Sequence, residues 1–118
     1  MKVISAKFVI MVADMARALR FYRDALGLAP AYESPHWCEL SVGGAVIALH
    51  GGGGEGARAR TGITLQVDDL AAATEAVRRA GGGVAGGPRE RRSEGIVLAD
   101  VVDTEGNAFT LTAAIAKA

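Results

Sequence analysis

The alternation of apolar and polar positions predicts one strand-and-helix unit that occurs twice along the chain. Residues 7–28 read KFVIMVADMARALRFYRDALGL, and residues 62–83 read GITLQVDDLAAATEAVRRAGGG. In both segments a strand-like alternation leads to an aspartate, which is followed by apolar residues at helical spacing and then by a glycine. Asp14 corresponds to Asp69, and their neighbours match at the same offset. The pattern therefore indicates a duplicated module.

The first module is predicted to contain one helix and several strands. Asp14 is expected to cap the helix, because its carboxylate can accept hydrogen bonds from the free backbone N–H groups of the first turn. Gly27 is expected to end the helix, since glycine adopts a left-handed conformation without a Cβ clash. The strands are expected over residues 7–12, 37–42 and 45–50, with a Gly43-Gly44 hairpin turn and a loop or short edge strand around Tyr32.

The second module repeats this order after a glycine-rich segment. Residues 51–60, GGGGEGARAR, are interpreted as a flexible linker, because consecutive glycines bury no side chains and lose much entropy on folding. A phosphate-binding loop is the alternative, but the Gly-Lys-Ser/Thr ending is missing and no helix follows. The helix is expected from Asp69 to about Ala80. The strands are expected over residues 62–67, near Val84, and over 96–102 and 108–112, joined by a turn at 103–107.

These elements predict an α+β fold of two βαβββ modules in a single domain, residues 1–118, with a tail at 113–118 that is frayed or forms a short helical cap. The modules are expected at about 1–50 and 61–113. Along each strand one set of alternate residues is apolar and the other is mixed, which is typical of a sheet with helices on one face and a cleft on the other. We therefore expect a curved mixed sheet with a concave cleft and outer helices. In the first strand, Phe8 and Ile10 would face the helix.

Composition and charge exclude several classes of protein. The chain has 13 Lys plus Arg and 13 Asp plus Glu, so no overall field attracts nucleic acid or an anionic membrane. The arginines at 89–92 are interrupted by a glutamate and predict a solvated loop or strand edge. Cys38 is the one cysteine, which excludes an intrachain disulfide and a cysteine zinc site. No signal-peptide cleavage region or membrane span is evident, so we expect a cytoplasmic protein.

Three segments carry a resemblance to a known family: VADMARALRFYRDALGL, WCELSVGGAVIALH and DTEGNAFTL. In this order and spacing, and with the internal duplication, they resemble the vicinal oxygen chelate superfamily. That superfamily includes glyoxalase I, bleomycin-resistance proteins and extradiol dioxygenases. The resemblance covers nearly the whole chain.

The resemblance implies four points on the concave face where family enzymes hold a metal ion, usually with His and Glu. These points fall here on Lys7, Ala48, Gly62 and Thr110. Ala48 and Gly62 have no donor side chain, Lys7 would have to lose its proton, and Thr110 is a poor neutral donor. A catalytic metal normally needs about three His or carboxylate ligands. We therefore predict no metal, no cofactor and no assigned catalytic residue.

The concave face nevertheless carries side chains suited to a small organic ligand. Trp37 could stack on a planar ligand, Glu39 could pair with a cationic group, and polar groups could orient the ligand. The alternative interpretations are that Trp37 fills the sheet or an interface, and that Glu39 and His50 are ordinary strand residues. The predicted ligand-binding residues are Lys7, Met11, Trp37, Glu39, His50, Gln66 and Thr110.

The leading hypothesis is a metal-free small-molecule-binding protein, similar to the family's antibiotic-sequestering members. The resemblance also implies a homodimer with clefts between its subunits. One alternative is a lyase, isomerase or dioxygenase that uses displaced ligands such as His36, His50 and Glu39, or a metal-independent general base. Another is a scaffold or regulatory domain whose cleft is closed by Trp37 and Met11.

Overall fold

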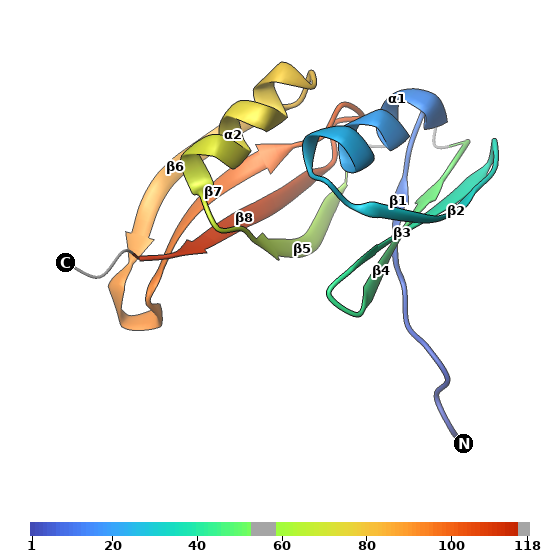
Figure 1. Cartoon of the computed structure of the whole chain (residues 1–118), viewed down its shortest axis with the longest axis horizontal. Helices are drawn as coiled ribbons and strands as arrows, with labels where there is room; N and C mark the ends of the chain where they lie inside the picture. Colours follow the sequence, from blue (N-terminus) through green and yellow to red (C-terminus); the bar gives the residue numbers. More distant parts are fainter. Residues whose placement is uncertain (53–58, 116–118) are drawn as a thin grey trace.

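The computed structural model of the chain describes residues 1–52 and 59–115. Residues 53–58 of the predicted linker and residues 116–118 of the predicted tail lie outside the described residues. The elements follow the order βαβββ twice, as predicted (Figure 1). The α+β fold class is therefore confirmed.

The first module closely follows the predicted elements. Its helix α1 continues directly into a π-helical segment, Phe21–Ala25. The region around Tyr32 forms an edge strand rather than a loop. The bounds are β1 (Phe8–Met11), α1 (Met15–Arg20), β2 (Ala29–Glu33), β3 (Trp37–Val42) and β4 (Ala45–His50).

The second module has the same order of elements, and its second strand is longer than predicted. The predicted weak strand near Val84 is β6, which extends through the arginine-rich segment to a 3-10 turn at Arg92–Glu94. Register shifts beside Gly86 interrupt its pairing with β7, so its side chains show no clear alternation. The bounds are β5 (Arg60–Gln66), α2 (Leu70–Arg79), β6 (Gly83–Arg91), β7 (Ile96–Val102) and β8 (Ala108–Ala114).

The strands of residues 1–52 and 59–115 form two four-stranded sheets with identical topology. We call them sheet A, with the order β1-β4-β3-β2, and sheet B, with the order β5-β8-β7-β6. In each sheet the first strand of the module pairs in parallel with the last, and the remaining pairs are antiparallel. The internal duplication of the sequence is therefore a duplication of topology, and β1 and β5 each form one edge of their sheet.

The predicted helix caps and turns are confirmed. Asp14 accepts a hydrogen bond from the Arg17 backbone, and Asp69 accepts one from the Ala72 backbone, each at 3.0 Å. Both aspartates have extended backbone angles, as expected for residues that precede a helix. Gly43 and Gly44 have φ values of +49° and +86°, which suits a tight two-residue hairpin.

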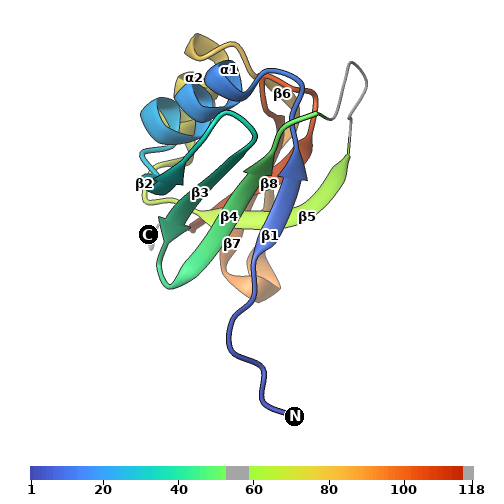
Figure 2. The same cartoon turned by 90° about the vertical axis from the view of Figure 1, so that its right-hand side faces the viewer.

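The core lies between the helices and one face of each sheet. It combines Ile10 and Leu49 of sheet A with Val101 and Leu111 of sheet B in one continuous cluster. Phe21, at the end of α1, reaches across to the second module. Its ring meets Phe109 edge-on, with 6.3 Å between the ring centroids. Figures 1 and 2 show the two helices side by side above the strands.

Phe8, which was expected to face the helix, is not buried. Phe8 shares a face with Ile10, but its exposed fraction is 55%, whereas that of Ile10 is 2%. Phe8 lies at the start of an edge strand, next to the N-terminal segment that extends away from the sheet (Figure 2). Alternation correctly gives its face, but burial also requires a helix long enough to reach that end of the strand.

In the described parts of the chain, no helix combines the length and the apolar character needed to cross a membrane.

Candidate functional site

The face of sheet A that points away from the helices carries five of the seven predicted ligand-binding residues. Trp37, His50 and Met11 are neighbours in register across β3, β4 and β1. Glu39 and Ala48 belong to the next row of the same face, and Lys7 comes directly before β1. Strand pairing therefore gathers residues that are far apart in the sequence on one surface.

Side-chain contacts join four of these residues into a cluster. The indole Nε1 of Trp37 donates to Glu39 Oε2 at 2.7 Å, and Lys7 Nζ donates to the same oxygen at 3.1 Å. The imidazole of His50 is edge-on to the indole, with 5.8 Å between the ring centroids. Its Nδ1 lies 2.6 Å from the backbone oxygen of Gly51. We call Lys7, Trp37, Glu39 and His50 the sheet A cluster.

Glu39 is an ionised carboxylate within this cluster. The hydrogen bond from Trp37, followed by the hydrogen bond and the charge of Lys7, lowers the pKa of Glu39 below its ordinary value. The prediction that Glu39 pairs with a cationic ligand is not tested, but its carboxylate already has a cation and a neutral donor. Any ligand cation would share this carboxylate with Lys7.

Tyr32 and Val9 belong to the same surface and were not among the predicted ligand contacts. Tyr32 pairs in register with Glu39, and Val9 pairs with Ala48. Their exposed fractions are 56% and 52%, so both side chains are accessible. The position of Val9 on this face could be predicted, because Val9 and Met11 are alternate residues of one strand. Tyr32 was hidden by a register shift between Pro30 and Tyr32, which breaks the period of two.

The remaining two predicted residues lie on sheet B. Thr110 pairs in register with Thr64 and with Asp100, and Gln66 pairs with Thr112. Among the described residues, no hydrogen bond or ion pair links Gln66 or Thr110 to the sheet A cluster. The structure thus forms two separate groups of predicted contacts, one on each sheet.

A small cavity of about 230 Å³ lies beside Thr110. Asp100 at its wall binds Arg89, with 2.6 Å between Nη1 and Oδ2. This hydrogen bond, with the charges of Arg89, Arg60 and Arg91, lowers the pKa of Asp100. The wall therefore combines an ionised, paired carboxylate with hydroxyl groups. The cavity is lined by Arg60, Gly62, Ile63, Thr64, Asp100, Ala108, Phe109 and Thr110.

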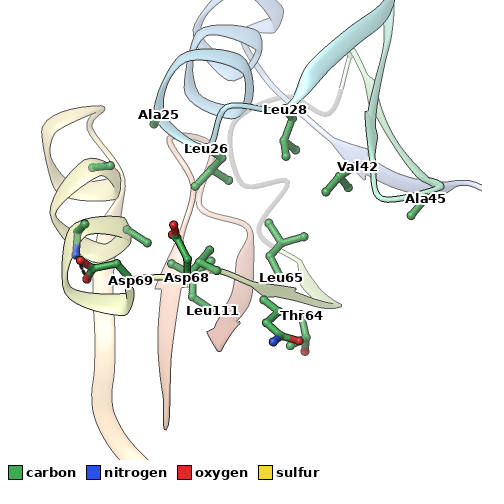
Figure 3. Close-up of a pocket in the computed structure, with 15 residues that line it drawn as sticks. Ala25, Leu26, Leu28, Val42, Ala45, Thr64, Leu65, Asp68, Asp69 and Leu111 are labelled. Carbon is green, nitrogen blue, oxygen red and sulfur yellow. Dashed lines mark hydrogen bonds between the residues drawn. The ribbon is translucent and has the colours of Figure 1, made fainter. Parts of the chain in front are cut away.

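A second cavity, of about 490 Å³, is lined by residues of both modules. Figure 3 shows Leu26 and Leu28 of the first module opposite Leu65 and Leu111 of the second. Gln66 also lines this cavity, whereas none of the sheet A cluster does. Its walls are mostly apolar.

The four family positions for a metal ligand do not suit a metal ion. Lys7 is ion-paired, and Ala48 is fully buried, with an exposed fraction of 0%. Gly62 has φ +73°, a left-handed conformation that side chains rarely adopt, at a register shift in β5. Within residues 1–52 and 59–115, no group of three or more His, Cys, Asp or Glu side chains is arranged to hold a metal. The residues present therefore do not fit the family's metal.

The turn between β7 and β8 has a role that the sequence did not reveal, because it joins the two modules. Glu105 accepts hydrogen bonds from the backbone of Ala13 and Asp14, at 3.0 and 2.8 Å. Its other oxygen accepts from Arg17 Nε at 2.7 Å. Asn107 donates to the backbone oxygen of Met11 at 2.9 Å. The DTEGN turn of the second module thus makes hydrogen bonds to the first module and holds the two modules together. We call this turn and its partners the joint.

Buried polar groups at this joint have shifted pKa values. Burial by itself would raise the pKa of Glu105, but hydrogen bonds from Arg17, the Asp14 backbone and Thr104 lower it to about 2. The hydroxyl of Tyr22 donates to Asp103 at 2.6 Å, and burial together with that carboxylate raises the pKa of Tyr22 well above its usual value. Tyr22 itself belongs to the core, since its exposed fraction is 1%.

Comparisons with known proteins agree with this fold. A profile of the Glyoxalase/Bleomycin resistance protein/Dioxygenase superfamily matches residues 5–111. A superfamily enzyme from Burkholderia phytofirmans has a TM-score of 0.77 at 19% identity, covering 93% of this chain and 100% of its own. A fosfomycin resistance protein from Mesorhizobium loti has a TM-score of 0.75 at 20% identity, covering 98% and 95%.

The bleomycin-binding protein of Streptomyces verticillus, solved with copper(II)-bleomycin, has a TM-score of 0.63 at 17% identity and covers 99% of each chain. At these identities the likeness shows the fold alone. No curated protein matches the chain.

Proposed function

Because the chain belongs to the Glyoxalase/Bleomycin resistance protein/Dioxygenase superfamily, we propose that it binds a small organic molecule without a metal ion. The observation that carries this proposal is the chemistry of the four family ligand positions. One is an ion-paired lysine, one a buried alanine, one a glycine with positive φ and one a threonine. What remains on these surfaces is aromatic area, hydroxyl groups and paired charges, which are the usual components of a small-molecule site.

We assign the contacts to two walls. The first is the face of sheet A, with Lys7, Met11, Trp37, Glu39 and His50. The second is the face of sheet B, with Gln66 and Thr110. In this proposal Trp37 supplies apolar contact area, and the hydroxyl of Thr110 and the amide of Gln66 orient polar groups of the ligand.

We further propose that the protein is a homodimer in which each cleft combines sheet A of one protomer with sheet B of its partner. Two observations support this arrangement. The edge strand β1 exposes Phe8, Val9 and Met11, with exposed fractions of 55%, 52% and 38%. The edges of β1 and β5 carry no partner strand among the described residues. Unpaired apolar edges of this kind favour association with another chain.

An enzymatic function ranks second in this proposal. Glu39 and His50 are the candidates for a general base, and the depressed pKa of Glu39 and its two partners make Glu39 a weak base near neutral pH. We also propose a cytoplasmic location, since the lone buried Cys38 suits a reducing compartment.

The proposal is tested by measuring metal content and ligand binding on the same tag-free protein. Elemental mass spectrometry after dialysis against Fe, Ni, Zn and Mn should find no stoichiometric metal. A thermal-shift screen of natural products, with fosfomycin and bleomycin included, should find compounds that raise Tm. Binding of a hit should be lost in Trp37→Ala without an equal loss of stability.

One tightly held ion per chain would contradict the proposal, and His50 and Glu39 would then be the first residues to replace. A screen without any stabilising compound would also count against it and would favour a scaffold or regulatory role.

A further inference from the structure

We infer that Glu39 is a positioning residue that fixes the indole of Trp37, and that Lys7 neutralises Glu39 so that this wall recognises its ligand by stacking rather than by an ion pair. The statement about the ligand rests on the proposed function. The statement about positioning does not, because it concerns contacts within the chain.

The geometry of the cluster supports an internal role for Glu39. The hydrogen bond from Trp37 and the ion pair with Lys7 end on the same carboxylate oxygen, at 2.7 and 3.1 Å. The Glu39 side chain has an exposed fraction of 22%, against 40% for Lys7. A bond to an ionised acceptor is stronger than one between neutral groups, so the indole N–H has a firm anchor.

The indole is also held by its own strand and by the strand beside it. The backbone N–H of Trp37 donates to the hydroxyl of Ser34 at 3.1 Å, which fixes the start of β3. The imidazole of His50 meets the indole edge-on from the adjacent strand. With its N–H bound to Glu39, the ring has few alternative positions. A fixed ring loses less conformational entropy when a ligand binds against it.

The charges of the wall cancel locally. Lys7 and Glu39 form a pair of zero net charge. The exposed side chains beside them, Tyr32, Val9 and Met11, are aromatic or apolar. A cationic ligand would have to compete with Lys7 for the carboxylate, whereas an uncharged conjugated ring needs only the aromatic surface. The wall therefore suits a flat, uncharged, conjugated group.

The positioning role is tested by NMR, because Trp37 is the one tryptophan in the chain and its indole N–H gives a single resonance. Solvent exchange of this proton is compared in the wild type, Glu39→Leu, Glu39→Gln and Lys7→Met. We expect exchange to rise about fivefold in Glu39→Leu, which has no acceptor, and to stay within about twofold in the other two variants. Equal exchange in Glu39→Leu and the wild type would overturn the positioning role.

The ligand class is tested with two probes, acridone, which is flat and uncharged, and dicyclohexylammonium, which is a saturated cation. Acridone should bind the wild type more tightly, with an affinity that salt changes by less than about twofold. Its affinity should fall about fivefold in Glu39→Leu and recover in Glu39→Gln. Tighter, salt-sensitive binding of the ammonium would overturn the inference. Absence of acridone binding would overturn the ligand class, while the natural-product screen still decides the proposed function independently.

Discussion

At the scale of single residues, the backbone conformation of Gly62 explains why this position cannot easily hold a metal ligand. The family position that it occupies calls for a metal ligand, yet its φ of +73° disfavours any L side chain there. The backbone conformation of β5 at Gly62 therefore disfavours any residue with a side chain that could bind a metal ion. Placing a histidine at this point would add local strain of roughly 1–2 kcal/mol.

Glu105 is a buried carboxylate that makes the stability of the protein depend on pH. Its side chain has an exposed fraction of 0%, and its pKa is lowered from 4.5 to about 2. A carboxyl group with a lowered folded-state pKa contributes stability that is fully present above its unfolded pKa and is lost as the pH falls through its folded pKa. Glu105 should therefore contribute about 3 kcal/mol above pH 5, and this should be lost towards pH 2.

We predict that Glu105→Gln lowers the free energy of unfolding at neutral pH by about 2–3 kcal/mol, because Arg17 loses its buried partner. Urea unfolding between pH 7 and pH 2 provides the measurement. The difference between the variant and the wild type should shrink as the pH falls below the ordinary carboxyl range. Glu75→Gln is the matched control, since Glu75 pairs with Arg79 on an exposed helix surface, and should cost about 0.5 kcal/mol or less. A constant difference across the whole range would refute the prediction.

At the scale of elements, the turn between β7 and β8 determines how the modules meet. Its polar residues Asp103, Glu105 and Asn107 are buried, although turns are normally exposed. They bind the end of β1, the start of α1 and Tyr22 in its π-helical extension. This five-residue turn therefore adds buried polar contacts to the apolar packing between the two modules.

We predict that Asn107→Ala lowers the free energy of unfolding by about 2–4 kcal/mol, because two backbone groups lose buried partners. These groups are the oxygen of Met11 and the N–H of Ala59, at 2.9 and 3.0 Å from the Asn107 amide. Chemical denaturation monitored by circular dichroism gives this value. Thr74→Ala removes one exposed side-chain hydrogen bond and should change stability by less than about 0.5 kcal/mol. A similar small effect for Asn107→Ala would show that water satisfies the joint equally well.

At the scale of the whole molecule, the edge strand β1 of sheet A exposes more apolar surface than the edge strand β6 of sheet B. Strand β1 exposes Phe8, Val9 and Met11, and the N-terminal segment adds Val3 and Ile4. One of the two edge strands of sheet B, β6, carries glycines, a proline and charged residues instead. Strands with proline and charge resist pairing with other chains, whereas β1 has neither.

We therefore predict that the protein forms a dimer through β1. Light scattering coupled to size-exclusion chromatography should give about twice the mass of the 12.1 kDa chain. Val9→Lys should shift the equilibrium towards the monomer, because it places a charge within the apolar edge. Ala85→Lys, at an exposed position of β6, should leave the dimer intact. A monomeric wild type, or equal effects of the two variants, would contradict this assembly.

Much of the fold could be predicted from the sequence, because the relevant signals are local. Alternation gave the bounds of β3 and β4, Asp14 marked the start of α1, and Gly27 marked the end of its π-helical extension, since these features depend only on neighbouring backbone geometry. The site was predicted less completely. Residues on one strand face followed from alternation, but the register shifts in β2 and β6 do not follow from composition, so Tyr32 was missed.

By itself, the sequence determined that this protein has two βαβββ modules and no usable ligand at the family's metal positions, because periodicity and residue type are readable without long-range contacts. Only the tertiary structure decided which partners the polar residues have. Lys7 and Glu39 are 32 residues apart, and Ala13 and Glu105 are 92 apart, yet each pair is in hydrogen-bond contact. The physical reason is that a hydrogen bond depends on distances of about 3 Å, which strand register and module packing set and no local pattern records.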